Sequence, residues 1–275
     1  MLVNGIAGNL ISICDRGLLY GDGVFRTLRA TQGKVLHWPL HYLKLKHDCA
    51  ALSIVCPEEA LLCSELDIVL AKHPDGVIKL IITRGQGGRG YMPTADTAPT
   101  RIWDFSPLPS YPPEWVEQGI RACVCSLRLS SQPRLAGIKH LNRLENVLAA
   151  AELNDAQIHG EQVGEGLLLD AKGHLIEGTR SNLFLVSHGQ LVTPDLSRCG
   201  VAGIQRGRVM VWALQHGLTL QVRDILLEEA MQADELFVVN SIIGLWSIRE
   251  LEQRCWSHFP VATQIRHDLD QQDEG

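Results

Sequence analysis

The sequence predicts a protein of mixed α and β structure in two parts, and two observations support this. Predicted strands and helices are interspersed along 275 residues, which is enough for one large domain or two ordinary ones. The clearest linker is the proline-rich run Ser106-Pro107-Leu108-Pro109-Ser110-Tyr111-Pro112-Pro113, and we place a domain boundary there.

The composition is that of a soluble globular protein, with 45% hydrophobic and 20% charged residues. The net charge is −6 and no basic block is present, which argues against nucleic acid or an anionic membrane as a partner. No apolar run is long enough to span a bilayer. The start, Met1 to Gly5, lacks the features of a signal peptide.

The eight cysteines are scattered and follow no C-x-x-C spacing. Cys123 and Cys125 are the closest pair, and alternate residues of a strand point the same way. No histidine-rich counterpart suggests a zinc site. We therefore expect reduced thiols in a cytoplasmic protein and no bound metal.

In the first part, the turn signal Asn4-Gly5 predicts a hairpin. The glycines of Tyr20-Gly21-Asp22-Gly23 predict a tight turn. Turn and periodicity signals predict further elements at Val24 to Ala30, Lys34 to Trp38, Pro39 to about Leu52, Glu58 to about His73, Val77 to Thr83 and Ile102 to Phe105; the third and fourth are helices and the others strands.

The stretch Arg84 to Tyr91 matches G-x-G-x-x-G literally, which would suggest a dinucleotide fold. Its context argues against that reading, because Pro93 stands where a helix should start. We interpret the stretch as a glycine-rich loop that carries two arginines, Arg84 and Arg89.

In the second part, alternation and turn residues predict mostly strands and hairpins. The predicted strands are Ile120 to Leu129, Gly166 to Asp170, His174 to Glu177, Asn182 to Val186, Gln190 to Thr193 and Leu236 to Asn240. A helix is predicted to follow the run Gly200-Val201-Ala202-Gly203-Ile204-Gln205 and to continue to about His216. The tail from Asp268 is expected to fray.

The stretch from Arg134 to Glu152 has the strongest chemical signal. Leu141, Leu144, Leu148 and Ala151 recur at helical spacing, which predicts a helix with that face buried. Asn142 and Glu145 fit a capping box, which places the helix start at Asn142. Lys139 would then precede a helix N-terminus in an apolar setting, which lowers a lysine pKa and suits Schiff-base chemistry. A surface lysine in a loop is the alternative.

Taken together and in this order, the motifs resemble the class IV (fold type IV) pyridoxal-phosphate enzymes. The motifs that carry this resemblance are Tyr20-Gly21-Asp22-Gly23, the Lys139 stretch, Glu177-Gly178-Thr179-Arg180-Ser181-Asn182-Leu183-Phe184 and Gly203-Ile204. The resemblance covers nearly the whole chain. It favours Schiff-base chemistry at Lys139 over a surface lysine in a loop. Ala136 to Arg143 and Arg84 to Tyr91 are most similar to the aminodeoxychorismate lyases of that family.

The resemblance implies pyridoxal 5′-phosphate as the cofactor. Lys139 matches the lysine that holds the cofactor and shuttles protons, and Glu177 matches the carboxylate that pairs with the pyridine nitrogen. Gly203, Ile204 and Ser241 match phosphate contacts, and a helix N-terminus suits a phosphate. Lys44 stands where the family usually has a phosphate-binding arginine, and a lysine lacks the two-point fork.

The resemblance also implies the reaction: 4-amino-4-deoxychorismate would give 4-aminobenzoate and pyruvate, feeding folate synthesis. Arg101, Arg84 and Arg89 are candidates to bind the two substrate carboxylates. A class IV aminotransferase acting on branched-chain or D-amino acids is the first alternative. A cofactor-free α/β binding protein is the second.

By resemblance, the fold is a two-domain α/β (α+β) architecture like that of D-amino acid aminotransferase. We expect a smaller N-terminal domain over residues 1–106, a linker over 107–117 and a larger C-terminal domain over 118–275. The cofactor would lie at their interface, and the protein would be a homodimer.

Overall fold

The computed structural model describes residues 1–94, 97–154 and 156–274, and the chain forms two compact units. Unit 1 comprises Met1–Pro109 and Ile138–Asn142, and unit 2 comprises Ser110–Gly137 and Arg143–Gly275. The division after Pro109 lies inside the predicted linker. Part of that linker is the helix α4 (Pro113–Glu117), which a proline can begin. The sequence did not predict that five residues around Lys139 belong to unit 1.

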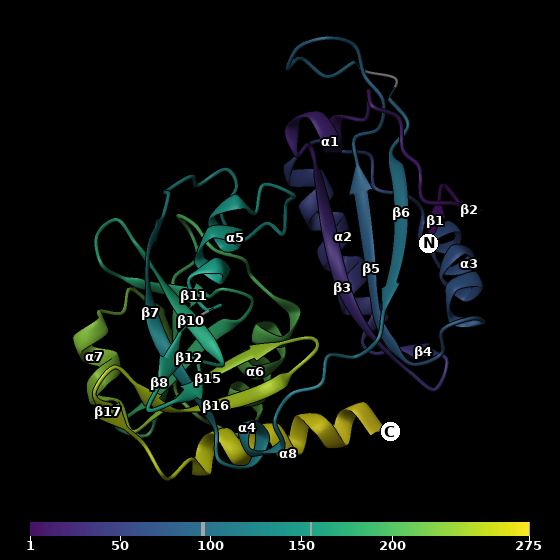
Figure 1. The fold of residues 1–275 in the computed structure, drawn as a ribbon. Coiled ribbons are helices and arrows are strands. Elements are labelled where there is room, and N and C mark those ends of the chain that lie inside the picture. The colour runs from purple at the N-terminus through teal and green to yellow at the C-terminus, as the bar shows by residue number, and fades with distance from the viewer. Residues whose placement is uncertain (95–96, 155, 275) are drawn as a thin grey trace. The chain divides into compact units, whose positions relative to one another are not determined.

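Unit 1 is built on a six-stranded sheet in the order β2-β1-β6-β5-β3-β4, with every neighbouring pair antiparallel (Figure 1). The strands are β1 (Leu2–Val3), β2 (Ile6–Ala7), β3 (Gly23–Thr31), β4 (Lys34–Val35), β5 (Gly76–Thr83) and β6 (Thr100–Ser106). The hairpins turn at Asn4-Gly5 and Gln32-Gly33, all four with positive φ, and the turn predicted at Asn4-Gly5 is confirmed.

Three helices belong to unit 1: α1 (Arg16–Tyr20), α2 (Trp38–Ala51) and α3 (Glu59–Leu70). Helices α2 and α3 confirm the two predicted helices. The short helix α1 was missed; the Asp15 side chain caps it, and Gly21 ends it in the left-handed conformation. Alternate residues of β3 and β5 pack with α2 and α3 in one core, which includes Val24, Leu28, Leu45, Leu66 and Ile82.

Unit 2 contains a nine-stranded sheet in the order β11-β10-β7-β16-β15-β12-β13-β14, with β17 paired to β16. The strands are β7 (Ile120–Leu129), β10 (Glu165–Asp170), β11 (Leu175–Gly178), β12 (Asn182–Ser187), β13 (Gln190–Pro194), β14 (Leu220–Arg223), β15 (Glu235–Asn240), β16 (Gly244–Leu251) and β17 (Arg254–Cys255). A separate small hairpin joins β8 (Gln157–Ile158) to β9 (Glu161–Gln162). Three neighbouring pairs, β7/β10, β7/β16 and β13/β14, are parallel.

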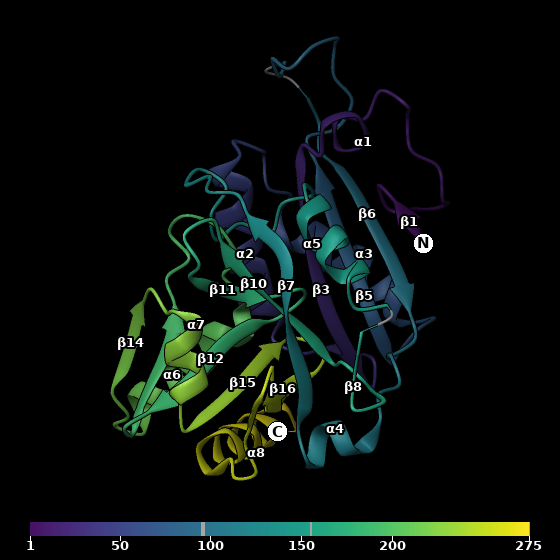
Figure 2. The same ribbon diagram turned by 60° about the vertical axis from the view of Figure 1, so that its left-hand side comes forward.

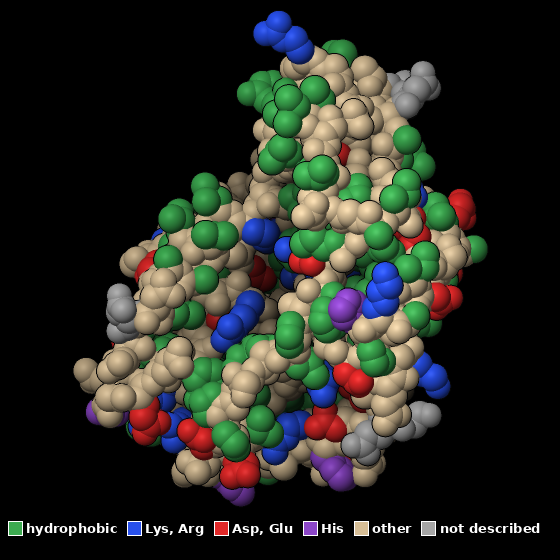
Figure 3. Space-filling view, turned by 45° about the vertical axis from the view of Figure 1, so that its right-hand side comes forward, with side chains coloured by type: hydrophobic (Ala, Val, Ile, Leu, Met, Phe, Trp, Pro, Cys, Tyr) green, Lys and Arg blue, Asp and Glu red, His purple; other side chains and the backbone are tan. Residues whose placement is uncertain are grey.

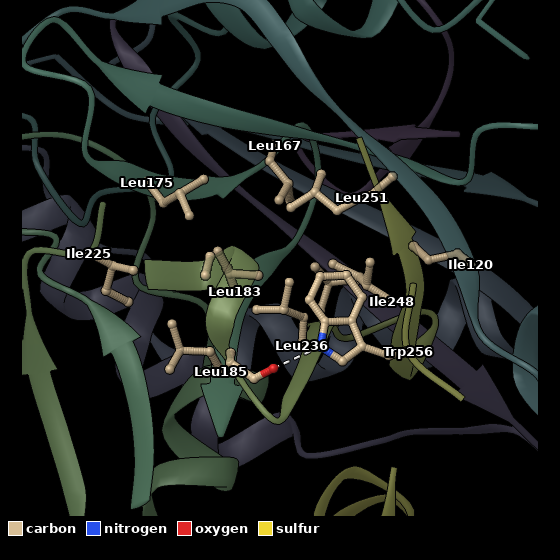
Figure 4. Packing of buried hydrophobic residues seen from close by; sticks show 14 of the residues in the cluster. Ile120, Leu167, Leu175, Leu183, Leu185, Ile225, Leu236, Ile248, Leu251 and Trp256 are labelled. Carbon is tan, nitrogen blue, oxygen red and sulfur yellow. Dashed lines mark hydrogen bonds between the residues drawn. The ribbon is translucent and has the colours of Figure 1, made fainter. Parts of the chain in front are cut away.

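Both faces of the central strands of unit 2 are buried. Leu183 of β12 and Leu236 of β15 belong to a core that also holds Trp256, whose indole N–H donates to the Ala233 carbonyl oxygen at 2.8 Å (Figure 4). Phe184 and Phe237, the next residues along those strands, point the other way. They pack beneath α6 (Ile204–Gln215) and α8 (Pro260–Glu274), the second of which runs along β15 and β16 (Figure 2). Helix α7 (Leu227–Gln232) completes unit 2.

Two helix predictions in unit 2 are wrong. Helix α5 (Leu144–Ala151) begins one residue later than a helix capped by Asn142 would, with Arg143 and not Asn142 at its N-cap. Glu145 does not close a capping box, because it accepts the main-chain N–H of Ser130 instead. The apolar face of α5, which the sequence predicted to be buried, is exposed: Leu144 is 68% exposed and Leu148 is 53% exposed. The tail from Asp268 is helical and does not fray, since α8 continues to Glu274.

The surface carries charged side chains of both signs interspersed with hydrophobic ones on the face drawn in Figure 3. Within residues 1–94, 97–154 and 156–274, no helix is both long and apolar enough to cross a membrane. The eight cysteines are free thiols.

Candidate active site

Lys139 lies on a short extended segment that pairs with the edge of β3. His140 forms an antiparallel bridge with Val24, and the N–H of Phe25 donates to the Lys139 carbonyl at 3.0 Å. The Asn142 amide donates to the Gly21 carbonyl oxygen at 3.3 Å, close to the turn that ends α1. These bonds attach the segment to unit 1.

The pairing with β3 fixes the direction of the Lys139 side chain. Ile138 and His140 are buried, whereas Lys139 is half-buried and alternates to the other face. Its Nζ lies 4.6 Å from the centroid of the Phe25 ring, and the Nζ of Lys79 lies 5.0 Å from it. The predicted position directly before a helix is wrong, because the helix begins at Leu144, in unit 2.

A buried carboxylate, Asp48 on α2, connects three basic residues of unit 1. Its Oδ2 accepts the main-chain N–H of Lys139 at 3.1 Å and pairs with Arg26 Nη2, while its Oδ1 accepts from Lys44 Nζ. The Asp48 side chain is 0% exposed and that of Arg26 is 3% exposed. Although burial raises the Asp48 pKa, the charges of Arg26 and Lys44 hold it below its usual value. Burial lowers the pKa of Lys44, and Asp48 opposes that shift.

His41 lies one turn before Lys44 on α2 and is also buried. Burial, followed by the positive charges of Arg26, His37 and Lys139, lowers its pKa to about 3. The imidazole is therefore neutral at any working pH. Its Nδ1 has no hydrogen-bond partner among the described residues.

In unit 2, Glu177 lies near the end of β11, beside the loop that leads into α6. Its carboxylate is 3% exposed and accepts the Val201 N–H at 2.8 Å. Asn182 fixes the same loop from β12, since its amide donates to the Val201 carbonyl at 2.7 Å and its oxygen accepts the Gly203 N–H at 3.1 Å. Glu177 and the start of α6 are thereby held together.

The start of α6 is open to a ligand because its N-cap is Gly203, which has no side chain to cap the helix. A Cβ at Gly203 would lie 2.5 Å from the Asn182 oxygen, so only glycine fits there without displacement. Ile204 is the first residue of the helix. Main-chain N–H groups and the helix dipole favour an anion at this position.

Ser241 follows β15 in a turn that the Asn240 side chain organises. The Asn240 side-chain oxygen accepts the N–H groups of Ile242 and Ile243. The Asn240 side-chain amide donates to the Arg180 carbonyl oxygen at 3.1 Å. Since β15 pairs with β12 through Val239 and Asn182, Ser241 lies near the strand end that carries Asn182.

The arginines predicted to bind substrate have different surroundings. Arg84 contacts both oxygens of Asp22 and the main-chain carbonyls of Leu52 and Ser53. Arg101 pairs with Glu65 at 2.8 Å. Arg89 is exposed and has no ion pair or hydrogen bond with any residue that the structure describes.

The structure thus groups the predicted site residues by unit. Lys44 and Lys139 belong to unit 1, whereas Glu177, Gly203, Ile204 and Ser241 belong to unit 2. The sequence analysis missed Arg26, His41, Asp48 and the bridging role of Asn182. Arg26 carried a signal, because it is the one charged residue among the buried alternate positions Val24, Leu28 and Ala30 of its strand. Asp48 carried another, as it lies four residues after Lys44 on a helix.

Comparison with known proteins gives consistent matches over nearly the whole chain. Residues 23–251 match the family model described as amino-transferase class IV. An aminodeoxychorismate lyase of Vibrio harveyi is 36% identical over 244 residues, 88% of each chain. A putative branched-chain-amino-acid aminotransferase of Methanocaldococcus jannaschii is 34% identical, over 89% of this chain and 83% of its own. The crystal structure of 4-amino-4-deoxychorismate lyase from Pseudomonas aeruginosa matches with a TM-score of 0.92 and 42% identity over 98% of both chains.

Proposed function

The chain belongs to the amino-transferase class IV family, and we propose that within it the protein is a pyridoxal 5′-phosphate-dependent 4-amino-4-deoxychorismate lyase. The observation that carries the proposal is the likeness in sequence and fold, over almost the full length, to lyases of that name. The reaction would convert 4-amino-4-deoxychorismate to 4-aminobenzoate and pyruvate in the cytoplasm, for folate synthesis.

The residues present fit the proposed cofactor. Its phosphate needs cations and N–H donors, and unit 1 offers Lys44, while unit 2 offers the uncapped start of α6 at Ile204. Its pyridine nitrogen needs a carboxylate, and Glu177 is buried and fixed by the Val201 N–H. When bound, the cofactor supplies an electron sink for the reacting carbon.

Each of these side chains has a defined task in the proposal. The Lys139 amine would hold the cofactor, and it would also take the proton from substrate C4. Glu177 would keep the pyridine nitrogen protonated. Lys44, Ser241 and the start of α6 at Gly203 and Ile204 would bind the phosphate, with the Gly203 N–H itself already donating to the Asn182 oxygen. Loss of the enolpyruvyl group makes the ring aromatic, so the protein mainly positions groups and moves a proton.

The three candidate arginines differ in the partners they already have, and this difference favours Arg89 as the residue that binds a substrate carboxylate. Arg84 and Arg101 already contact Asp22 and Glu65, and a substrate carboxylate would have to compete with those partners. Arg89 lies on the exposed loop with no such competitor among the described residues. We expect Arg89→Ala to raise KM by about tenfold, the scale of one charge-assisted contact. Arg134→Ala, an exposed arginine elsewhere, serves as the control.

A class IV aminotransferase is the competing function, favoured by the Methanocaldococcus relative. The two reactions differ in what they require: a lyase regenerates its starting state in each turnover, whereas an aminotransferase needs a 2-oxo acid acceptor. Purified protein should be incubated with 4-amino-4-deoxychorismate and no 2-oxo acid. We expect 4-aminobenzoate and pyruvate in equal amounts. No 4-aminobenzoate, with rapid amino transfer from L- or D-amino acids to 2-oxoglutarate, would establish the aminotransferase instead.

We further propose a homodimer, and the exposed face of α5 supports an apolar contact with a second copy. Leu144, Val147 and Leu148 are 68%, 60% and 53% exposed and share one side of the helix. The substitution Leu148→Glu should shift the protein from dimer to monomer in sedimentation. The control Glu152→Gln, on the next turn, should leave the dimer intact. A monomeric wild-type protein at micromolar concentration would contradict the proposal.

A further inference from the structure

The most unusual feature of unit 1 is the buried pair of Arg26 and Asp48. Arg26 projects from the sheet face that otherwise buries Val24, Leu28 and Ala30. Taking two charges out of water is costly, and apolar replacements of such pairs are often neutral or stabilising. Arg26 Nε also has no partner among the described residues, which adds to the cost. Stability alone therefore does not account for this pair.

The two oxygens of Asp48 have different partners. Oδ1 faces Lys44, four residues earlier on the same helix, and Oδ2 faces Arg26 and the main-chain N–H of Lys139. One carboxylate thus contacts the side chain proposed to bind phosphate and the backbone of the residue proposed to attach the cofactor. Arg26 balances its charge, so Asp48 does this without adding net negative charge beside a phosphate.

We propose that Asp48 is a positioning residue, which holds the Lys44 ammonium ready for the cofactor phosphate and fixes the main chain at Lys139. This inference rests on the proposed function. A lysine is a point charge on a flexible stem and loses rotamer freedom when it binds an anion. Holding it in place beforehand reduces that loss. A buried acceptor for Lys44 therefore offsets part of what is lost when lysine replaces the family's arginine.

The test uses Arg26→Leu/Asp48→Ala, which removes both charges and keeps the local net charge unchanged. Affinity is measured for pyridoxal phosphate and for pyridoxal, which lacks the phosphate. We expect the affinity for pyridoxal phosphate, divided by the affinity for pyridoxal, to fall by about tenfold. This is the scale of ordering one long side chain. The ratio should not fall further when the pair is replaced in a protein that already carries Lys44→Ala. In the cofactor-free protein, hydrogen exchange at the Lys139 amide should become faster.

The matched control is Arg121→Leu/Glu250→Ala, which removes a largely buried pair of unit 2 and should leave the ratio unchanged. If the first double variant does not fold, Arg26→Gln/Asp48→Asn removes the charges with little change in volume and should lower the ratio in the same direction. An unchanged ratio with unchanged exchange at Lys139, in a protein whose wild type binds pyridoxal phosphate, overturns this inference alone. A wild type that attaches no pyridoxal phosphate at Lys139 overturns the proposed function and this inference with it.

Discussion

Each unit carries a group of predicted cofactor-binding residues, and the two groups are built in different ways. In unit 2, Glu177, Asn182 and Gly203 lie on two short stretches, and the Asn182 carboxamide and the Glu177 carboxylate fix these stretches to each other. In unit 1, Arg26 comes from a strand, Asp48 from a helix, and Lys139 from a segment more than ninety residues further along the chain. The first arrangement depends on main-chain hydrogen bonds and the second on buried charges.

This difference has a physical consequence. The hydrogen bonds between the Asn182 side chain and the glycine-containing loop join neutral groups, so they fix the geometry with little dependence on pH. A buried network of charges is more sensitive, because removing one partner leaves another uncompensated. We therefore expect substitutions in unit 2 to change chemistry with little loss of stability, and changes in unit 1 to affect both.

The largest effect is expected from Lys139→Ala. Without the amine, neither covalent attachment nor proton removal is possible, and turnover should fall by about a thousandfold or more. The control is Lys79→Ala, because the Nζ of Lys79 lies over the same Phe25 ring at 5.0 Å. Borohydride reduction followed by peptide mapping should label Lys139. A label on Lys79, on another lysine or on none would contradict the assignment.

The next effect is that of Glu177→Gln, which keeps the size of the side chain and removes its charge. The amide can still accept the Val201 N–H, so the fold should be preserved. We expect the cofactor to bind while turnover falls by about tenfold or more, the scale of a lost electrostatic contact. Glu235→Gln is the control, as Glu235 is a buried carboxylate that accepts N–H groups at the start of α8. An unchanged rate in Glu177→Gln would exclude this role.

The contrast between the units also decides what the sequence could predict. Family and fold class are confirmed, and the hairpin turns were read correctly, because turn residues and alternation are local signals. The motif from Glu177 to Phe184 and the Gly203-Ile204 pair could be recognised for the same reason. Their roles at a cofactor stay predictions.

The contacts among Arg26, Asp48 and Lys139 in unit 1 could not be predicted, because they join residues far apart in the sequence. Asn142 and Glu145 matched a capping box by spacing, but Asn142 contacts Gly21 and Glu145 contacts Ser130. Tertiary partners therefore displaced the local pattern. Nothing in a single sequence shows that Ile138–Asn142 pairs with β3, and without that pairing Asp48 has no visible relation to Lys139.

A smaller and measurable effect concerns acid stability in unit 1. His41 has a folded pKa of about 3, against 6.5 when unfolded, so the unfolded chain binds more protons between these values. The free energy of unfolding should therefore fall as the pH drops from 6.5 toward 3, with a loss of about 2 kcal/mol at pH 5 from this group. Replacing it, as in His41→Gln, should remove that part of the loss. The measurement is urea unfolding at pH 7.5 and pH 5.0.

His258→Gln is the control for this pH effect, since His258 is an exposed histidine of unit 2. Equal pH dependence in wild type and His41→Gln would show that the buried charges of unit 1 do not set its acid sensitivity. The contrast between the two units would then rest on geometry alone.

The smallest effect is expected from Lys44→Arg, which restores the residue type usual in the family. A guanidinium has donors enough to keep Asp48 Oδ1 and also contact a phosphate at two points. Cofactor affinity should be equal or up to about fivefold tighter, a gain of about 1 kcal/mol. Lys44→Ala should bind cofactor more weakly than either. The control is Lys46→Arg, because Lys46 is exposed on the same helix. Equal affinity in wild type, Lys44→Arg and Lys44→Ala would place Lys44 outside the phosphate site. The pair of Arg26 and Asp48 would then act on the site only by fixing the main chain at Lys139.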